Sequence, residues 1–291
     1  MLYKLPGKTR KLNFLKKINF MSKKIAILGM GVTGIYAAFA AEEAGHNVTV
    51  FTKNKNILFP PGPFWLHWLP DSLTDKFEPT PIYHIGRGSE RKYQSLQWGR
   101  IPKTHPKSSF PEKDEFKYGY NPKDVLPAMA PTNIKIIKKF LTDEDVDIMA
   151  ENYDEIFQTF PSELSKIYQP PLLEYYMGID IFEFRKNTSK DNYVIYNGTG
   201  EGIVVREINL WMKKFLEFPK YVALKEIKKV YSDQRYKFIK LFDLDPFSKI
   251  WTQPFQIDPK IHLVGRWAEW NNKRLSHEAY KIVKDILAKD I

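Results

Sequence analysis

The sequence predicts an α/β fold with a parallel sheet and an interleaved, mixed-sheet second domain. Two observations predict this class. Residues 24–52 have the pattern of a strand, a glycine turn, a helix and a second strand, and residues 261–288 have the pattern of a buried strand, a glycine and a terminal helix. Short strand-like runs separated by turns lie between these two ends of the chain. We therefore expect one domain to be built from both ends and another to be inserted into it.

The glycine turn at residues 29–34 indicates a Rossmann-like domain. Ile25–Leu28 is suited to a strand buried on both faces, and it leads directly into the sequence Gly29-Met30-Gly31-Val32-Thr33-Gly34. In this pattern the first glycine makes a tight turn, the second lets backbone approach a pyrophosphate, and the third lets the helix lie against the strand. We expect Gly29, Gly31, Val32, Thr33 and Gly34 to bind a dinucleotide at the helix N-terminus. The alternative is a parallel sheet whose glycines only permit close packing.

The residues after the motif do not decide which dinucleotide binds. A helix through residues 35–41 is followed by a parallel strand at Val48–Phe51. About 20 positions after the motif such sites normally carry an acid that accepts a ribose hydroxyl. Here Thr52 holds that place, with Lys53 and Lys55 after it. Thr52 can still accept from a ribose hydroxyl, whereas the lysines suit a ribose phosphate, so FAD and NADP both remain open on local grounds.

Composition narrows the class of protein. Hydrophobic residues make up 43% of the 291 residues and aromatic residues 15%, which is typical of a folded enzyme. The absence of cysteine excludes disulfides, thiolate metal sites and thiol nucleophiles, and favours a cytoplasmic protein. Six of the eleven net positive charges lie in residues 1–20, which leaves +5 for the rest. Those residues are either a basic arm or a segment before a true start at Met21. No run approaches the roughly 20 apolar residues that cross a bilayer.

The middle of the chain predicts a second domain of short strands. The strand candidates are residues 82–85, 93–98, 133–140, 147–150, 153–161, 179–185, 193–196, 203–208, 222–230, 236–243 and 248–251. Candidate ligands of an anionic substrate are Arg87, Arg91, Arg100 and His105, against the alternative of a solvated basic face. Arg206 stands in an apolar run and needs a partner if it is buried. Glu207 or an anionic ligand is expected to supply that partner.

Three separated pieces resemble the FAD-dependent group that includes UDP-galactopyranose mutase, amine oxidases and protoporphyrinogen oxidase. They are residues 29–34, the strand end from Tyr153-Asp154 to Thr159-Phe160-Pro161, and Val264-Gly265-Arg266 with Trp270 before the terminal helix. The last piece is most similar to the mutase-type ending, and residues 196–206 are similar to the strand and arginine that face the substrate. Together the pieces cover about a third of the chain. The resemblance implies FAD as the cofactor, with Thr159, Gly265, Arg266 and Trp270 beside it.

The loop at residues 57–70 is a further candidate for this site. Its prolines exclude a helix interior or a central strand. Because the segment after the second strand commonly approaches the isoalloxazine ring in flavin enzymes, Gly62 and His67 are candidates to line it, and His67 is a catalytic candidate. The alternative is a tryptophan and phenylalanine core cluster with His67 hydrogen-bonded at its edge.

The resemblance also implies a division of the chain. Residues 1–20 are the leader or arm, and the FAD-binding domain comprises residues 21–78, 131–165 and 255–291. The substrate domain comprises residues 79–130 and 166–254.

The function implied is that of an FAD-dependent oxidoreductase, or a flavin-dependent mutase or lyase, acting on a small anionic or amine-bearing substrate. A mutase-like enzyme would use Arg206 to hold a diphosphate, and an amine-oxidase-like enzyme would remove hydride from a C–N bond. The alternatives are a flavoenzyme that modifies a nucleic-acid base, an NADP-dependent oxidoreductase, and a nucleotide-binding regulator without turnover. No metal site and no membrane partner are expected.

Overall fold

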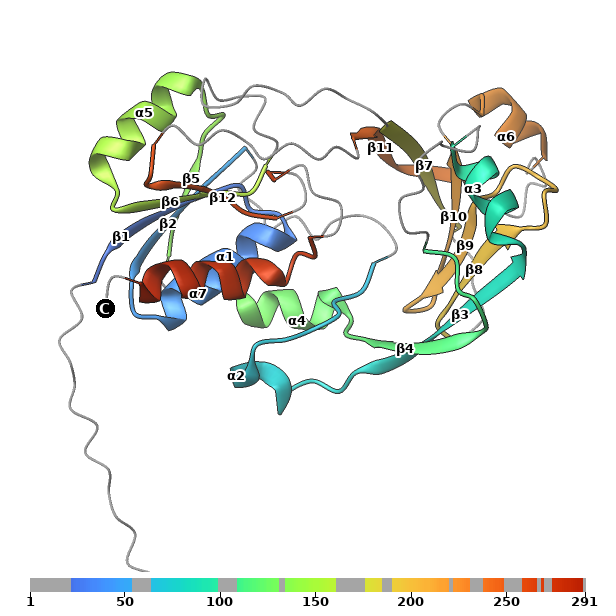
Figure 1. The fold of residues 1–291 in the computed structure, drawn as a ribbon, viewed down its shortest axis with the longest axis horizontal. Coiled ribbons are helices and arrows are strands. Elements are labelled where there is room, and N and C mark those ends of the chain that lie inside the picture. The colour runs from blue at the N-terminus through green and yellow to red at the C-terminus, as the bar shows by residue number, and fades with distance from the viewer. Residues whose placement is uncertain are drawn as a thin grey trace, which may run out of the picture.

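Two sheets, at opposite ends of the molecule, organise the chain (Figure 1). The computed structural model describes residues 22–53, 64–98, 109–130, 134–160, 176–184, 190–219, 222–230, 238–248, 258–265, 268–269 and 274–289. The five-stranded sheet has the order β12 (Ile261–Leu263), β6 (Glu155–Gln158), β1 (Lys24–Leu28), β2 (Asn47–Thr52) and β5 (Lys135–Lys138). The seven-stranded sheet has the order β11 (Phe238–Ser248), β7 (Tyr176–Phe184), β10 (Lys213–Pro219), β9 (Arg206–Leu210), β8 (Tyr193–Gly198), β3 (Thr80–Gly88) and β4 (Glu115–Gly119).

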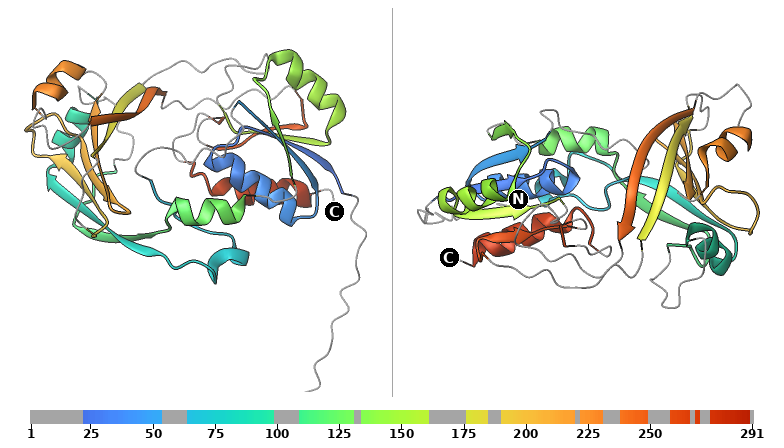
Figure 2. Two further views of the ribbon diagram at one scale, coloured as in Figure 1. Left: turned by 180° about the vertical axis from the view of Figure 1, so that it is seen from behind. Right: turned by 90° about the horizontal axis from the view of Figure 1, so that it is seen from above.

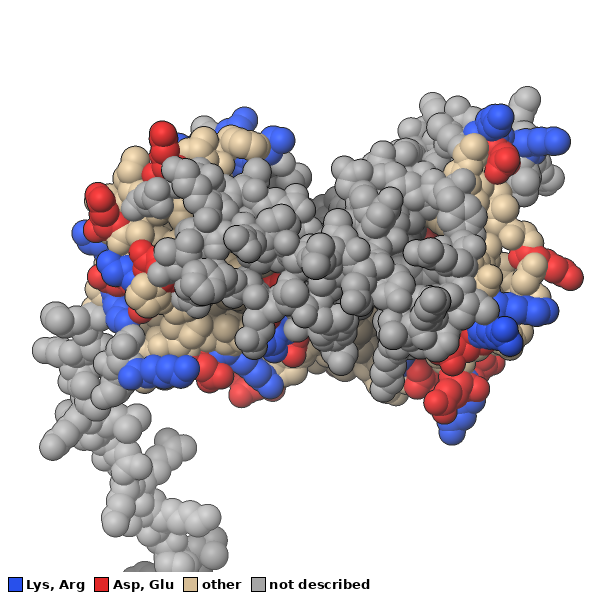
Figure 3. Space-filling model, turned by 45° about the horizontal axis from the view of Figure 1, so that its top comes forward, with Lys and Arg blue, Asp and Glu red and all other residues tan. Residues whose placement is uncertain are grey.

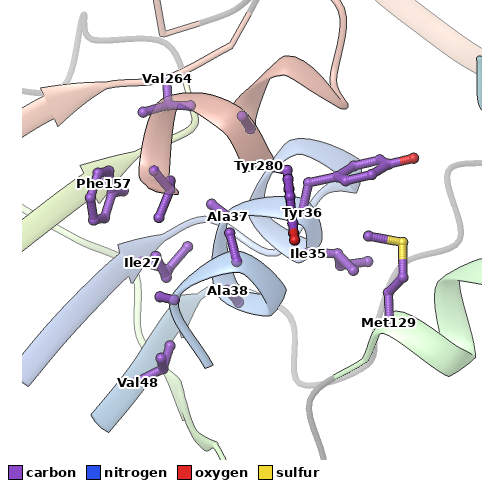
Figure 4. Packing of buried hydrophobic residues seen from close by; sticks show 14 of the residues in the cluster. Ile27, Ile35, Tyr36, Ala37, Ala38, Val48, Met129, Phe157, Val264 and Tyr280 are labelled. Carbon is purple, nitrogen blue, oxygen red and sulfur yellow. The ribbon is translucent and has the colours of Figure 1, made fainter. Parts of the chain in front are cut away.

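All neighbouring strands of the five-stranded sheet are parallel. Helices α1 (Val32–Glu43) and α7 (Glu278–Ala288) cover one face, and α5 (Asp143–Asn152) covers the other (Figures 1 and 2). Because successive strand residues point to opposite faces, Ile27 and Phe157 pack with α1 and α7 (Figure 4), whereas Leu28 and Ile156 pack with α5. Burial on both faces explains the continuous apolar runs of these strands.

The seven-stranded sheet is mixed. Strand β3 runs parallel to β8, and the other pairs are antiparallel. Helix α3 (Glu90–Trp98) buries Tyr93 against one face of this sheet, and α6 (Leu224–Val230) buries Ile227 against Leu216 and Phe218. The predicted α/β class, with a parallel sheet and a second, mixed sheet, is confirmed.

The two sheets are joined through residues 64–74 and 120–129. Leu66 and Tyr120 exchange two backbone hydrogen bonds, with N···O distances of 3.1 and 2.9 Å. Short helix α2 (Asp71–Thr74) follows the first of these segments, and α4 (Pro122–Met129) follows the second. Helix α4 packs against α1 through the buried side chains of Val125, Leu126 and Met129. The first excursion of the chain into the second sheet, through β3 and β4, therefore begins and ends on the first helix of the parallel sheet.

Three segments predicted as strands are helices: residues 93–98 lie in α3, residues 147–150 in α5 and residues 222–230 largely in α6. Helix α5 begins with a capping box, in which Thr142 Oγ1 accepts from the Asp145 N–H and Asp145 accepts from the Thr142 N–H. Its buried side chains, Val146 and Met149, are three residues apart and match one helix face. The three strand predictions were wrong because a short apolar run fits both the two-residue period of a strand and the 3.6-residue period of a helix. In α5 the capping box at Thr142 decides for the helix.

The other strand predictions are confirmed where the structure describes them, although β9 begins only at Arg206. Residues 1–20, Gly62, Arg100, His105, residues 249–251, Arg266 and Trp270 lie outside the described residues. In the described part of the chain, no helix has the length and apolar character needed to span a membrane.

Candidate functional site

Three segments that are distant in sequence meet at the carboxyl edge of the parallel sheet. Gly29 follows β1, Thr159 follows β6, and Gly265 lies just beyond β12. The Thr159 N–H and the Thr159 hydroxyl both donate to the Leu28 carbonyl, at 2.9 and 2.8 Å. A Cβ placed on Gly265 would lie 2.5 Å from the methyl carbon of Thr33. The structure thus brings together Gly29, Thr33, Thr159 and Gly265. Their expected contacts with a dinucleotide stay a prediction.

The three motif glycines have different surroundings. Gly29 has φ of +102°, and a Cβ there would lie 2.6 Å from Thr159 Oγ1. A Cβ on Gly34 would lie 2.1 Å from the Gly29 carbonyl oxygen, so both glycines are required for packing within the protein. Gly31 has φ of −77°, and a Cβ on it would meet no atom of the described residues within 4 Å. Close packing therefore explains Gly29 and Gly34 and leaves Gly31 facing open space.

The N-terminus of α1 has the electrostatic character of an anion site. Gly31 is its N-cap and provides no side-chain acceptor, and no acidic residue stands in the first turn. The first-turn N–H groups and the positive end of the helix dipole are thus left without a side-chain counterpart. At the same sheet edge, the side-chain oxygen of Gln158 is buried and has no hydrogen-bond partner among the described residues.

Thr52 and Lys53 lie at this edge as well. The Gly29 N–H donates to the carbonyl of Phe51 at 2.8 Å, which places the end of β2 beside the glycine turn. Thr52 is buried, and Lys53 is exposed with its Nζ 5.6 Å from the ring centroid of Phe140. Their expected contacts with the adenosine ribose or its phosphate stay a prediction.

His67 lies in an aromatic cluster. Its ring centroid is 5.3 Å from that of Trp65 and 6.3 Å from that of His277, the residue before α7. The cluster is held to α1 by the Tyr36 hydroxyl, which donates to the Trp68 carbonyl at 2.6 Å. Although His67 itself is exposed, this arrangement resembles the core cluster that we considered as the alternative. Its catalytic role stays a prediction.

Arg206 is paired across the β9–β10 hairpin with Glu217, which is buried. Burial lowers the pKa of the Arg206 guanidinium, but the carboxylate of Glu217 outweighs this and holds the pKa above its ordinary value. Glu207, the expected partner, points to the other face, where it accepts from the Tyr193 hydroxyl at 2.9 Å. The expectation that Glu207 supplies the partner was therefore wrong, because neighbouring residues of a strand face opposite sides of the sheet.

The other described arginines that were predicted to bind an anionic substrate do not lie beside Arg206. Arg87 lies on the face opposite to Arg206, where it lines a cavity of about 470 Å³. The complete lining is Arg87, Ile195, Asn197, Thr199, Glu201, Gly202, Val204, Glu207, Lys214 and Leu216. Arg91 is exposed on α3. The described arginines thus do not form one anion-binding cluster.

Sequence reasoning missed a buried polar network on the Arg206 face of the sheet. His84 is 1% exposed, and its Nδ1 lies 2.9 Å from the Tyr196 hydroxyl oxygen. Burial, with a contribution from Lys117, lowers the pKa of His84 to about 4, and burial raises the pKa of Tyr196 to about 12. The Arg206 guanidinium carbon lies 5.9 Å from the centre of the Tyr196 ring. Alternation with the buried Ile82 along β3 was the signal that could have identified His84.

Solved structures share this architecture. The flavin-dependent brominase Bmp2 aligns with a TM-score of 0.52 at 9% identity, over 92% of this chain and 80% of the brominase. The chain has the fold of flavin-dependent enzymes. The tryptophan 6-halogenase SttH from Streptomyces toxytricini has a TM-score of 0.51 at 8% identity, over 92% of this chain and 72% of the halogenase. The p-nitrophenol 4-monooxygenase PnpA from Pseudomonas putida DLL-E4 has a TM-score of 0.51 at 8% identity, over 93% of this chain and 81% of the monooxygenase.

At the level of sequence, no family model matches the chain, and no curated protein matches it. The shared fold agrees with the resemblance to FAD-dependent enzymes drawn from the sequence. Its narrower part, the likeness to mutases and amine oxidases, stays a prediction.

The different surroundings of Gly31 and Gly34 predict different stabilities for two matched variants. Gly34→Ala should lower the free energy of unfolding by at least about 3 kcal/mol, because the new methyl group meets backbone. Gly31→Ala should lower it by no more than about 1 kcal/mol, which is the scale of an N-cap change. Urea unfolding of both variants measures this difference. Equal losses would show that Gly31 is also a packing residue.

Arg206→Ala should lower the free energy of unfolding by about 3–5 kcal/mol, because it leaves the buried Glu217 carboxylate without its cation. Lys214→Ala is the control: Lys214 pairs with Glu207 at 2.8 Å on the same hairpin, but both side chains are 30% exposed. That control should change stability by less than about 1 kcal/mol. An Arg206→Ala protein with normal stability would instead favour a role for Arg206 in binding a ligand.

His84 should make the protein less stable in acid. Its pKa is lower in the folded state than in the unfolded state, so the unfolded chain takes up the proton first as the pH falls. The destabilisation by His84 is absent above about pH 6.5. Near pH 4 it should lower the free energy of unfolding by up to about 3 kcal/mol. Unfolding curves of the wild type and of His84→Asn, measured across this pH range, separate the effect of His84 from that of the other histidines. Parallel pH profiles for the two proteins would contradict it.

Proposed function

We propose that the protein is an FAD-dependent enzyme whose cofactor pyrophosphate binds between Gly31 and the N-terminus of α1. The observation that carries this proposal is the open space beside Gly31, next to two glycines that packing alone requires. A helix start without an acid or a side-chain cap suits a diphosphate. The fold likeness to flavin-dependent enzymes supports FAD rather than NADP as the dinucleotide.

In this proposal, residues at the carboxyl edge of the parallel sheet bind different parts of FAD or support the residues that do. Gly31 leaves room for the phosphates, and the first-turn amides of α1 donate hydrogen bonds to them. Thr52 accepts a ribose hydroxyl at the end of β2. Thr159 and Gly265 hold the neighbouring backbone segments in contact with the turn. Bound FAD supplies the redox chemistry.

We further propose that the substrate binds on the face of the seven-stranded sheet that carries His84, Tyr196 and Arg206. These side chains form a connected polar group in an otherwise apolar cluster. The Arg206 charge is matched by Glu217, so Arg206 acts as a positioning residue for Tyr196 rather than as a diphosphate clamp. This assignment favours an oxidoreductase over a mutase. Incubation with UDP-galactopyranose under reducing conditions, against a panel of amines, separates the two narrower classes.

The charges on the described part of the face seen in Figure 3 do not favour the nucleic-acid alternative. On the face seen in Figure 3, Lys and Arg side chains stand among Asp and Glu side chains over both ends of the molecule. A nucleic-acid surface is expected to be predominantly basic.

The purified protein should be yellow and should release FAD on denaturation. Gly31→Val should be colourless and yet unfold at nearly the temperature of wild-type protein stripped of its flavin, because the valine side chain fills only the space intended for the pyrophosphate. Absorbance spectra and chromatography of the released cofactor measure the first effect, and calorimetry measures the second.

Ala223→Val, at an exposed position in the other sheet's domain, is the matched control and should remain yellow. A colourless wild type that binds NADPH tightly would overturn the assignment of FAD. A yellow Gly31→Val protein would overturn the location of the pyrophosphate.

A further inference from the structure

Buried ring nitrogens without partners gather on one face of the seven-stranded sheet. Among the described residues, the buried side-chain atoms that lack a hydrogen-bond partner are Trp65 Nε1, His84 Nε2, Gln158 Oε1 and Trp211 Nε1. The three ring nitrogens all belong to side chains packed on or beside the apolar cluster around Tyr196. An unpaired buried polar group costs stability, so two such groups in neighbouring rings indicate a ligand that completes both. Trp65 and His84 are such a pair, whereas Trp211 lies in the turn between β9 and β10.

Trp65 and His84 form the closest association within this group. Their ring centroids are 5.3 Å apart, with the ring planes at 77°. His84 is held by its place in β3. Trp65 is held by Gly119, where a Cβ would lie 2.4 Å from Trp65 Cδ1, and by the backbone pairing of Leu66 with Tyr120. Both rings are therefore positioned by backbone on more than one strand.

The hydrogen bonds around Tyr196 determine which nitrogen of His84 carries the proton. At neutral pH the imidazole and the phenol are both uncharged, because burial lowers the pKa of His84 and raises that of Tyr196. We assign the Tyr196 hydroxyl as the donor to His84 Nδ1, because the Arg206 guanidinium beside Tyr196 can only donate and therefore occupies an acceptor position of the hydroxyl oxygen. The remaining proton of the imidazole then lies on Nε2. His84 Nε2–H and Trp65 Nε1–H are thus two neighbouring donors without an acceptor.

We propose that Trp65 and His84 bind the carboxylate of a small aromatic molecule. A carboxylate has only acceptors and can take one hydrogen bond from each N–H, and charged acceptors form the stronger bonds. Phe110 and Tyr196 supply aromatic surface beside the two donors. Trp65 is only partly buried, which leaves an approach along its ring. That this molecule is the substrate rests on the proposed function, whereas the binding itself does not.

The test is a titration of the full chain, labelled with ¹⁵N at tryptophan and histidine, with benzoate. The Trp65 indole and His84 Nε2–H signals, assigned through the variants, should shift together with one dissociation constant. Trp65→Phe and His84→Asn should each weaken benzoate binding by roughly tenfold or more, since each removes one hydrogen bond to a charged group. The amide oxygen in His84→Asn still accepts from Tyr196, so the loss isolates the Nε2–H donor. Benzylamine, with the same ring and a cation, should not shift these signals.

Trp211→Phe is the matched control, because it removes another unpaired indole N–H at the β9–β10 turn, and it should leave benzoate affinity unchanged. Absence of benzoate binding, binding without a shift of the two signals, or a proton on His84 Nδ1 would each overturn the inference. Flavin content measured on the same preparation separates the two proposals. A protein that contains flavin but does not bind benzoate contradicts only this inference, and a flavin-free protein that binds benzoate contradicts only the proposed function.

Discussion

The contact between Gly34 and the carbonyl of Gly29 determines how the first helix lies on the parallel sheet. With no side chain at Gly34, the helix backbone comes directly against the turn that it leaves, and a methyl group would stand 2.1 Å from a carbonyl oxygen. This close approach aims the start of α1 at the carboxyl edge of the sheet, where Thr159 and Gly265 arrive from distant parts of the chain. The space beside Gly31 exists because the turn on one side of it and the helix on the other are both held by backbone contact. Packing within the protein therefore forms the space beside Gly31 without the help of a ligand.

A second constraint connects this site to the seven-stranded sheet. The Leu66–Tyr120 backbone pair and the packing of α4 on α1 tie the segments before β3 and after β4 to the same helix that carries the glycine turn. The aromatic side chains of residues 64–68 reach both parts: Trp68 packs on Tyr280 of α7, and Trp65 packs on His84 of β3. A short segment thus links the proposed cofactor domain to the polar network of the second sheet. This arrangement suits an enzyme in which a bound cofactor and a substrate must meet.

Charge compensation on the seven-stranded sheet explains why Arg206 and Arg87 do not form one anion-binding cluster. A partly buried guanidinium is tolerated when a carboxylate lies within reach, and the buried Glu217 occupies that position across the hairpin from Arg206. The pair leaves Arg206 able to hold the Tyr196 hydroxyl, which in turn orients the His84 ring. Arg87, on the other face, belongs to a mixed polar cavity with Glu207 and Lys214. Similar residue types in one sheet therefore have different surroundings, according to the face on which they lie.

The sequence by itself determined the parallel sheet and the glycine turn, because these depend on local patterns: an apolar run, glycines at fixed spacing and an alanine-rich helix. The resemblance of three separated pieces to FAD-dependent enzymes also implied that Thr159 and Gly265 would lie beside the turn. Only the tertiary structure decided that Glu217 rather than Glu207 pairs with Arg206, and that His84 faces Tyr196 and Trp65. Those contacts depend on strand register and on which strands are neighbours, and the sequence carries no local signal for either. A related reason accounts for α3 and α6, where a short run is compatible with two periods and the surrounding contacts select the helix. For α5 the sequence does carry a local signal, the capping box of Thr142 and Asp145.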